Sequence, residues 1–102
     1  MDQTVIAGVG NIIATEALWM ARIDPRTPAR NLSAPDARAI VRALRREIER
    51  ELSNRELRFF VYGRAGEACP RCGATLRKLK LGGRTSAFCP KCQTRRRARL
   101  RA

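Results

Sequence analysis

The sequence holds two matched segments that decide its fold, Cys69-Pro70-Arg71-Cys72 and Cys89-Pro90-Lys91-Cys92, with 16 residues between them. Two Cys-X-X-Cys pairs separated by about 15–20 residues are typical of a four-thiolate zinc site, because each pair can turn tightly and direct both sulfurs at one ion. Four cysteines complete the tetrahedral coordination of zinc and leave no position for a substrate or an activated water. We therefore predict one structural Zn²⁺, bound by Cys69, Cys72, Cys89 and Cys92.

Two alternatives for the four cysteines are a pair of disulfides and an iron–sulfur cluster. Disulfides are disfavoured because Met1-Asp2-Gln3 lacks the basic-then-apolar layout of a secretion signal. The paired spacing is also less suited to an iron–sulfur cluster than to zinc. Between the pairs, Lys78 to Leu81 and Arg84 to Phe88 predict two strands joined at Gly82-Gly83. Such a hairpin would bring the two cysteine pairs together.

Charge divides the chain at the first cysteine. The 102 residues carry 22 Lys and Arg against 9 Asp and Glu, a net charge of +13, which makes a polyanion the expected partner. All nine acidic residues precede Cys69, so residues 1–68 have a net charge of +2 and residues 69–102 a net charge of +11. The chain is short and has few aromatic residues, so a metal ion is expected to supplement its small apolar core.

The residues before the cysteines predict two helices. Asn11 is placed as the N-cap of a helix from Ile12 to Met20, and glycines before it would expose amides to an anion such as phosphate. A second helix is expected from Ser33-Ala34-Pro35-Asp36 onward, with an apolar stripe facing the core. Its arginines are expected on a solvated face, partly paired with Glu47, Glu49 and Glu51. The stripe comprises Ile40, Val41, Leu44, Ile48 and Leu52. Residues 58–62 then predict a short strand or connector, and residues 63–66 a loop.

Four motifs in this order resemble one known family. They are Gly8 to Trp19, Ile23-Asp24-Pro25, Val61 to Glu67, and the cysteine module with Gly82-Gly83-Arg84. The chain is similar over almost its whole length to the C-terminal half of bacterial formamidopyrimidine-DNA glycosylases and their endonuclease VIII relatives. The resemblance implies a mainly α fold, with a helix-two-turns-helix DNA-binding module over residues 1–58, a zinc-finger hairpin over residues 59–94 and a basic tail over residues 95–102.

The resemblance also implies roles for individual residues. Asn11, together with loop amides such as that of Gly10, would bind a DNA phosphate beside the lesion. Arg84 at the hairpin tip would bind phosphate too, and it matches a family residue assigned to the later elimination step. Tyr62 and Arg64 match the family's segment that leads to the finger. For these two residues, DNA contact and a packing role are alternative expectations.

The chain departs from the family where the chemistry occurs. Family members are DNA glycosylases and AP lyases whose nucleophile is an N-terminal proline amine followed by a glutamate, whereas this sequence begins Met1-Asp2. We therefore expect no catalytic residue in this chain. The segment 52–58 is shorter than the family's lesion-capping region, and Asp24 stands where histidine is common, so base recognition is not expected either.

We expect a DNA-binding module of a base-excision-repair glycosylase, which grips the phosphates of damaged or abasic double-stranded DNA. One alternative is half of a split glycosylase that works with an N-terminal catalytic domain in trans. Another is a zinc-ribbon adaptor that binds RNA or protein. The longest apolar run is too short for a membrane span, and a cytoplasmic or nucleoid-associated location in a bacterium is expected.

Overall fold

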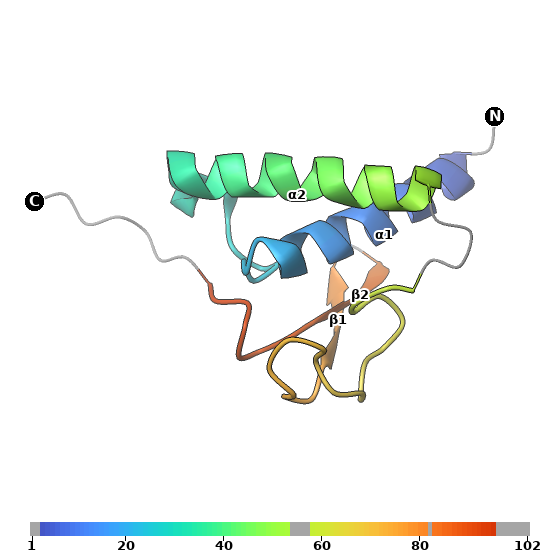
Figure 1. The fold of residues 1–102 in the computed structure, drawn as a ribbon, viewed down its shortest axis with the longest axis vertical. Helices are drawn as coiled ribbons and strands as arrows, with labels where there is room; N and C mark the ends of the chain where they lie inside the picture. Colours follow the sequence, from blue (N-terminus) through green and yellow to red (C-terminus); the bar gives the residue numbers. More distant parts are fainter. Residues whose placement is uncertain (1–2, 54–57, 82, 96–102) are drawn as a thin grey trace, which may run out of the picture.

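A computed structural model of the chain describes residues 3–53, 58–81 and 83–95. Helix α1 (Gln3–Met20) is followed by a short 3-10 helix (Ala29–Asn31), helix α2 (Ala34–Ser53) and strands β1 (Arg77–Leu81) and β2 (Arg84–Phe88). Figure 1 shows α2 on one side of α1 and the β1–β2 hairpin with the cysteine loops on the other. The predicted class, a small helical bundle followed by a four-cysteine hairpin, is confirmed.

Helix α1 begins earlier than the sequence indicated. It starts at Gln3 and continues through Gly8 and Gly10, so Asn11 lies within the helix and its prediction as the N-cap was wrong. A glycine costs only about 1 kcal/mol in a helix interior, so two glycines do not suffice to interrupt one. The amide of Gly10 is therefore not at the open end of a helix. The side chain of Asn11 is instead available for contacts outside α1.

The end of α1 was predicted correctly, but it is made by an unexpected residue. Arg22 adopts a left-handed backbone conformation, with φ of 63°, which glycine usually occupies after a helix. The amides of Arg22 and Ile23 donate to the carbonyls of Trp19 and Leu18, at 3.2 and 3.0 Å. These two bonds satisfy carbonyls that the end of the helix leaves unpaired, and the chain turns back at Ile23, which is 1% exposed.

The turn after α1 is held by Asp24. Its carboxylate accepts hydrogen bonds from the backbone amide of Arg26 at 2.8 Å and from the Arg26 guanidinium at 3.0 and 2.7 Å. Burial raises the pKa of Asp24, but the hydrogen bonds and charge of Arg26 outweigh burial and lower it below its usual value. Asp24 therefore serves as a buried, charged turn residue.

Helix α2 starts as predicted, with a reciprocal cap. The Ser33 hydroxyl accepts the amide of Asp36 at 3.1 Å, and the Asp36 carboxylate accepts the amide of Ser33 at 3.0 Å. Each side chain thus satisfies a backbone donor at the start of the helix.

The face that α2 buries differs from the prediction. Of the expected apolar stripe, Ile40 and Leu44 are partly buried, whereas Val41, Ile48 and Leu52 are 48%, 43% and 83% exposed. Only part of the stripe therefore faces the core. The fully buried residues of α2 are Ala43 and Glu47. The small Ala43 side chain is compatible with close approach of α1, and Glu47 is buried because Arg50 pairs with it. The spacing of apolar residues could not indicate that a glutamate is buried where α2 packs in the fold.

The hairpin follows the prediction. Strands β1 and β2 pair antiparallel, with Leu79 opposite Ser86 and Leu81 opposite Arg84. Gly83 in the turn has φ of 78°, a conformation that a side chain would strain. Residues 58–61 form a connector without strand pairing, which decides between the two possibilities left open for this segment.

One apolar core joins the helices to the finger. It contains Trp19 of α1 and Val61 of the connector, together with Cys69, Leu76, Ala87, Cys89 and Cys92. Helix α1 contacts both α2 and β2, and therefore lies at the centre of the fold. This core crosses the predicted boundary at residues 58 and 59, and the division into modules stays a prediction. Most of the predicted tail lies outside the described residues, among which no helix is long and apolar enough to cross a membrane.

Metal centre and candidate nucleic-acid interface

The four cysteines converge on one point. Their sulfur atoms all lie within 4.8 Å of one another. The Sγ atoms of Cys69 and Cys92 are 3.9 Å apart, and those of Cys72 and Cys89 are 3.4 Å apart. A tetrahedron with Zn–S bonds of about 2.3 Å has edges of about 3.8 Å, so these spacings fit a zinc ion. All four cysteines are free thiols rather than disulfides, and the predicted structural zinc site is confirmed.

Backbone amides shape both cysteine turns. The amide of Arg71 points at the sulfur of Cys69 at 3.4 Å, and the amide of Cys92 points at the sulfur of Cys89 at 3.3 Å. In the first turn, Gly73 has φ of 81° and its amide donates to the Cys69 carbonyl at 2.8 Å. These bonds orient the sulfurs toward one point in the folded finger, and N–H donors to sulfur favour the thiolate form that binds a metal.

Gln93 anchors the second cysteine turn to the helical part. It is 2% exposed, and its side-chain oxygen accepts the amide of Cys89 at 2.8 Å while its nitrogen donates to the Ile23 carbonyl at 3.0 Å. Sequence reasoning missed this residue, because a glutamine after a cysteine turn has no local signal that separates a buried anchor from a surface residue.

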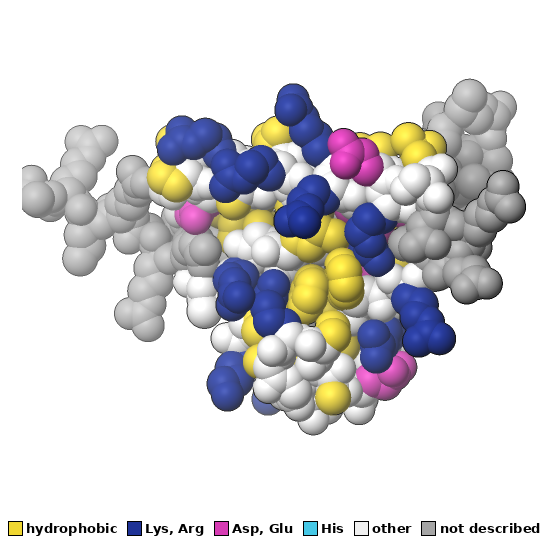
Figure 2. Space-filling model, viewed as in Figure 1, with side chains coloured by type: hydrophobic (Ala, Val, Ile, Leu, Met, Phe, Trp, Pro, Cys, Tyr) yellow, Lys and Arg dark blue, Asp and Glu magenta, His cyan; other side chains and the backbone are white. Residues whose placement is uncertain are grey.

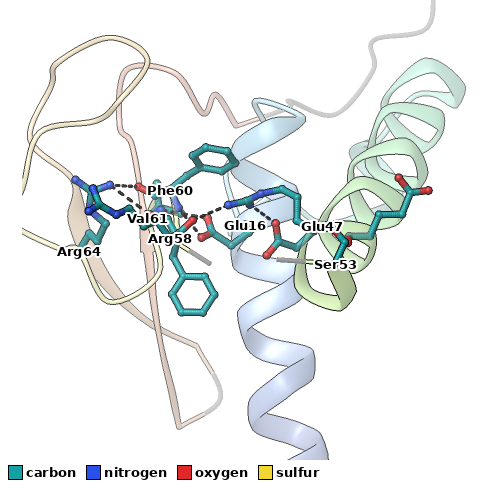
Figure 3. Close-up of polar contacts among 10 residues, drawn as sticks. Glu16, Glu47, Ser53, Arg58, Phe60, Val61 and Arg64 are labelled. Atoms are coloured by element: carbon teal, nitrogen blue, oxygen red, sulfur yellow. Dashed lines mark hydrogen bonds and ion pairs between the residues drawn. The ribbon is translucent and has the colours of Figure 1, made fainter. Parts of the chain in front are cut away.

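Glu16 is a second residue that the sequence did not single out. It is fully buried in α1, and its carboxylate accepts the amides of Phe60 and Val61 at 2.6 and 3.1 Å. Burial raises the pKa of Glu16, although these amides and the charge of Arg50 act in the opposite direction. Figure 3 shows Glu16 between the connector and α2, with Glu47 beside it. Glu16 thus holds the connector that leads into the finger against α1.

Arg50 completes this buried polar cluster. Its guanidinium pairs with Glu47, donates to the Arg58 carbonyl at 2.5 Å and lies 4.1 Å from the centre of the Phe60 ring. Burial and the neighbouring Glu51 carboxyl raise the pKa of Glu47 to about 7, more than Arg50 lowers it. The expected pairing of the α2 arginines with Glu47 is thus confirmed for this arginine, but its guanidinium bridges α2 and the connector and does not lie on a solvated face.

The structure brings Asn11 to the hairpin. Its side-chain amide donates to the Thr85 carbonyl at 2.9 Å, one residue after Arg84. One helical turn further along α1, the hydroxyl groups of Thr15 and Ser86 are 3.0 Å apart. Helix α1 therefore lies along the start of β2. Asn11, one of the two residues expected to bind phosphate, thus contacts the residue next to the other, Arg84, which is exposed.

Tyr62 and Arg64 are placed differently from each other. The Arg64 guanidinium donates to Glu67 at 3.0 Å and to the carbonyls of Phe59 and Phe60 at 3.3 and 3.4 Å, so it holds the connector in shape. Tyr62 packs edge-on against Phe59, with ring centres 5.5 Å apart. Tyr62 also lines an open cavity of about 360 Å³ that includes Lys78, Thr85 and Ser86 and so adjoins the Asn11 junction.

Basic side chains are spread over one face of the molecule. Figure 2 shows Lys and Arg distributed over α2 and over the finger on one face, with few acidic groups among them. A surface of this kind attracts polyanions over long distances.

Comparison with known proteins explains the combination of helices and finger. The family model described as the formamidopyrimidine-DNA glycosylase H2TH domain matches residues 1–59. A second model, described as the zinc finger found in FPG and IleRS, matches residues 66–95. The chain is 38% identical over 107 residues to the formamidopyrimidine-DNA glycosylase of Geobacter metallireducens, covering 92% of this chain and 40% of that protein. It is 42% identical over 110 residues to that of Roseiflexus sp., with 91% and 40% covered.

Solved structures agree with the sequence matches. A MutM structure in complex with DNA that contains carbocyclic 8-oxo-G has a TM-score of 0.74 and 33% identity, and covers 82% of this chain and 36% of that one. MutM (Fpg) from Thermus thermophilus has a TM-score of 0.73 and 39% identity, with 82% and 39% covered. The chain thus spans about two fifths of the length of the curated relatives that it matches. The match of both family models, in the order that the fold shows, establishes that the chain belongs to the formamidopyrimidine-DNA glycosylase family.

Proposed function

We propose that this chain binds the phosphate backbone of double-stranded DNA at the junction of α1 and the hairpin, as the DNA-binding module of a base-excision-repair glycosylase. The observation that carries the proposal is the 2.9 Å bond from Asn11 to Thr85, which fixes an amide side chain beside Arg84. Similar proteins have been solved with DNA that contains 8-oxo-G or an abasic site, and damaged or abasic duplex is the proposed ligand here.

The groups at this junction suit a phosphate. A carboxamide has two N–H hydrogens, so Asn11 can donate one to Thr85 and the other to a phosphate oxygen. The Arg84 guanidinium offers a planar fork of donors that matches phosphate geometry. Lys78, which lines the adjoining cavity, adds positive charge. Contacts of this kind position a protein on DNA without reading its sequence, and the proposed nucleoid location rests on this binding.

Direct binding measurements separate this proposal from an RNA or protein adaptor. Fluorescence anisotropy at low salt would compare labelled duplexes of one sequence: intact DNA, DNA with one abasic site, and RNA. We expect both DNA duplexes to bind and the abasic duplex to bind at least as tightly as the intact one. Binding to RNA with no binding to either DNA duplex would replace the proposal with the adaptor function.

We propose further that these 102 residues bind without chemistry of their own. The test is borohydride trapping on abasic duplex, with the zinc-depleted chain unfolded in urea as control, because that control keeps every amine of the protein. We expect the folded chain to trap no faster than the unfolded one. Faster trapping by the folded chain would show that the fold activates an amine as a nucleophile. That result would contradict this part of the proposal but not the proposed DNA binding.

A further inference from the structure

Two side chains outside the four zinc ligands donate hydrogen bonds to the ligand sulfurs. The indole nitrogen of Trp19 lies 3.4 Å from the sulfur of Cys69. The Nε atom of Arg71 lies 3.3 Å from the sulfur of Cys92. One donor comes from the last turn of α1 and the other from the first cysteine turn. The metal centre is therefore in contact with the helical part of the protein through its sulfurs.

Arg71 also binds Trp19 directly. Its Nη2 atom donates to the Trp19 carbonyl at 2.8 Å, and its guanidinium carbon lies 4.0 Å from the centre of the indole ring. Trp19 is only 7% exposed and stacks on Phe60, with ring centres 4.6 Å apart. One guanidinium thus contacts a zinc-ligand sulfur, the backbone at the end of α1 and an aromatic ring at the same time.

The charge of the site gives these contacts a physical role. Zn²⁺ with four thiolates carries a net charge of −2, and three of the four cysteines are buried. A buried anion needs donors and nearby positive charge to offset its lost hydration. The guanidinium of Arg71 provides both to the sulfur of Cys92, and the indole provides a donor to Cys69. Partners of this kind, which contact metal ligands rather than the metal, typically change affinity by about 10- to 100-fold.

We propose that Arg71 and Trp19 set the zinc affinity of this centre, and that Arg71 clamps the end of α1 to it. The four cysteines supply the ligands, and these two residues hold two of the sulfurs in their charged, oriented form. Trp19 then serves the metal site and the apolar core together.

The chain offers its own matched control. Lys91 occupies the same position in Cys89-Pro90-Lys91-Cys92 that Arg71 occupies in Cys69-Pro70-Arg71-Cys72. Lys91 is exposed, and it makes no hydrogen bond or ion pair with any residue that the structure describes. Arg71→Ala and Lys91→Ala therefore remove the same charge from the same place in each cysteine turn, but only the first removes contacts to sulfur and to Trp19.

Zinc affinity of the full chain would be measured by competition with a chromophoric chelator. We expect Arg71→Ala to weaken zinc binding by about 10- to 100-fold, and Lys91→Ala to change it far less. Arg71→Lys should recover only part of the loss, because an ammonium cannot reproduce the planar fork. Trp19→Phe, which keeps an aromatic ring and removes the indole donor, should weaken binding in the same direction. Equal affinities for Arg71→Ala and Lys91→Ala would overturn the proposal.

A second measurement stays informative if a variant folds poorly without metal. Cobalt-substituted protein shows thiolate-to-cobalt charge-transfer absorption, which depends on the hydrogen bonds that the sulfurs receive and is recorded on the metal-loaded form. We expect the bands to shift in Arg71→Ala and Trp19→Phe and to be unchanged in Lys91→Ala. Unshifted bands in Arg71→Ala and Trp19→Phe would show that neither side chain acts on the sulfurs, and would likewise overturn the proposal.

Discussion

The side chain of Asn11 donates a hydrogen bond to the backbone carbonyl of Thr85 at 2.9 Å, across 74 residues of sequence. Because Thr85 follows Arg84 in β2, this bond joins α1 to the residue next to the arginine of the hairpin turn. The proposed phosphate site therefore depends on the contact between the helical part and the finger, and neither part contains it alone.

Substitutions at Asn11 should weaken DNA binding in a defined order. Asn11→Ala removes the tether to Thr85 and a phosphate donor, and we expect a loss of about 1–2 kcal/mol in binding free energy. Asn11→Asp should cost more, because it also places a negative charge beside the phosphate. Anisotropy titrations of the zinc-loaded variants on one duplex would check the order. Wild-type affinity in both variants would remove Asn11 from the site.

Glu16 should be a major determinant of stability. Glu16→Ala leaves the amides of Phe60 and Val61 buried without an acceptor, and we expect a loss of about 2–4 kcal/mol in the free energy of unfolding. Glu49→Ala, at an exposed position of α2, is the control and should change stability by less than about 0.5 kcal/mol. Urea unfolding of the zinc-loaded proteins measures both. Equal stability of the two variants would contradict the role given to Glu16.

The raised pKa of Glu47 makes stability depend on pH. The pKa of Glu47 is about 7 in the folded chain, against a usual 4.5. Between pH 4.5 and pH 7 the folded state therefore keeps a proton that the unfolded state has lost. Stability therefore falls as pH rises through this window. Glu47→Gln keeps an acceptor for Arg50 and cannot ionise, so its stability relative to wild type should rise by about 1–2 kcal/mol from about pH 5 to about pH 8. An unchanged difference between the two proteins at the two pH values would rule out this assignment.

Removal of zinc should affect the finger first. Four thiols without metal no longer cross-link residues 69–92, so this region should unfold and expose Trp19, the single tryptophan of the chain. We expect its fluorescence to shift to longer wavelength on addition of a chelator, while the helical circular dichroism falls less. The helical signal should persist because α1 and α2 pack against each other without the finger. Retention of the wild-type tryptophan spectrum in metal-free protein would contradict this view of the core.

Local patterns in the sequence predicted the parts of the fold that depend on near neighbours. The cysteine pairs, the β1–β2 hairpin and the Ser33 cap each depend on residues close in sequence, and each was confirmed. The end of α1 was also found, although Arg22 rather than glycine makes it.

Long-range contacts account for what the sequence could not predict. The donors to Glu16 lie 44 and 45 residues away, and nothing near Glu16 marks it as a buried anchor. On α2, the apolar spacing favoured one stripe as the core face, yet its members Val41, Ile48 and Leu52 are exposed. The buried position is instead taken by Glu47, which pairs with Arg50. Which face a helix buries depends on its partner, and that partner is known only from the structure.

The salt dependence of duplex binding tests the central claim most directly. The logarithm of the binding constant should fall with the logarithm of salt concentration by about 0.9 per phosphate neutralised, so loss of one phosphate contact should reduce the slope by about 0.9. We predict this reduction, with weaker binding, for Arg84→Ala. Arg45→Ala is the control, because Arg45 is exposed on α2, which makes no contact with the hairpin among the described residues. An Arg84→Ala slope equal to that of wild type would contradict the proposed phosphate site.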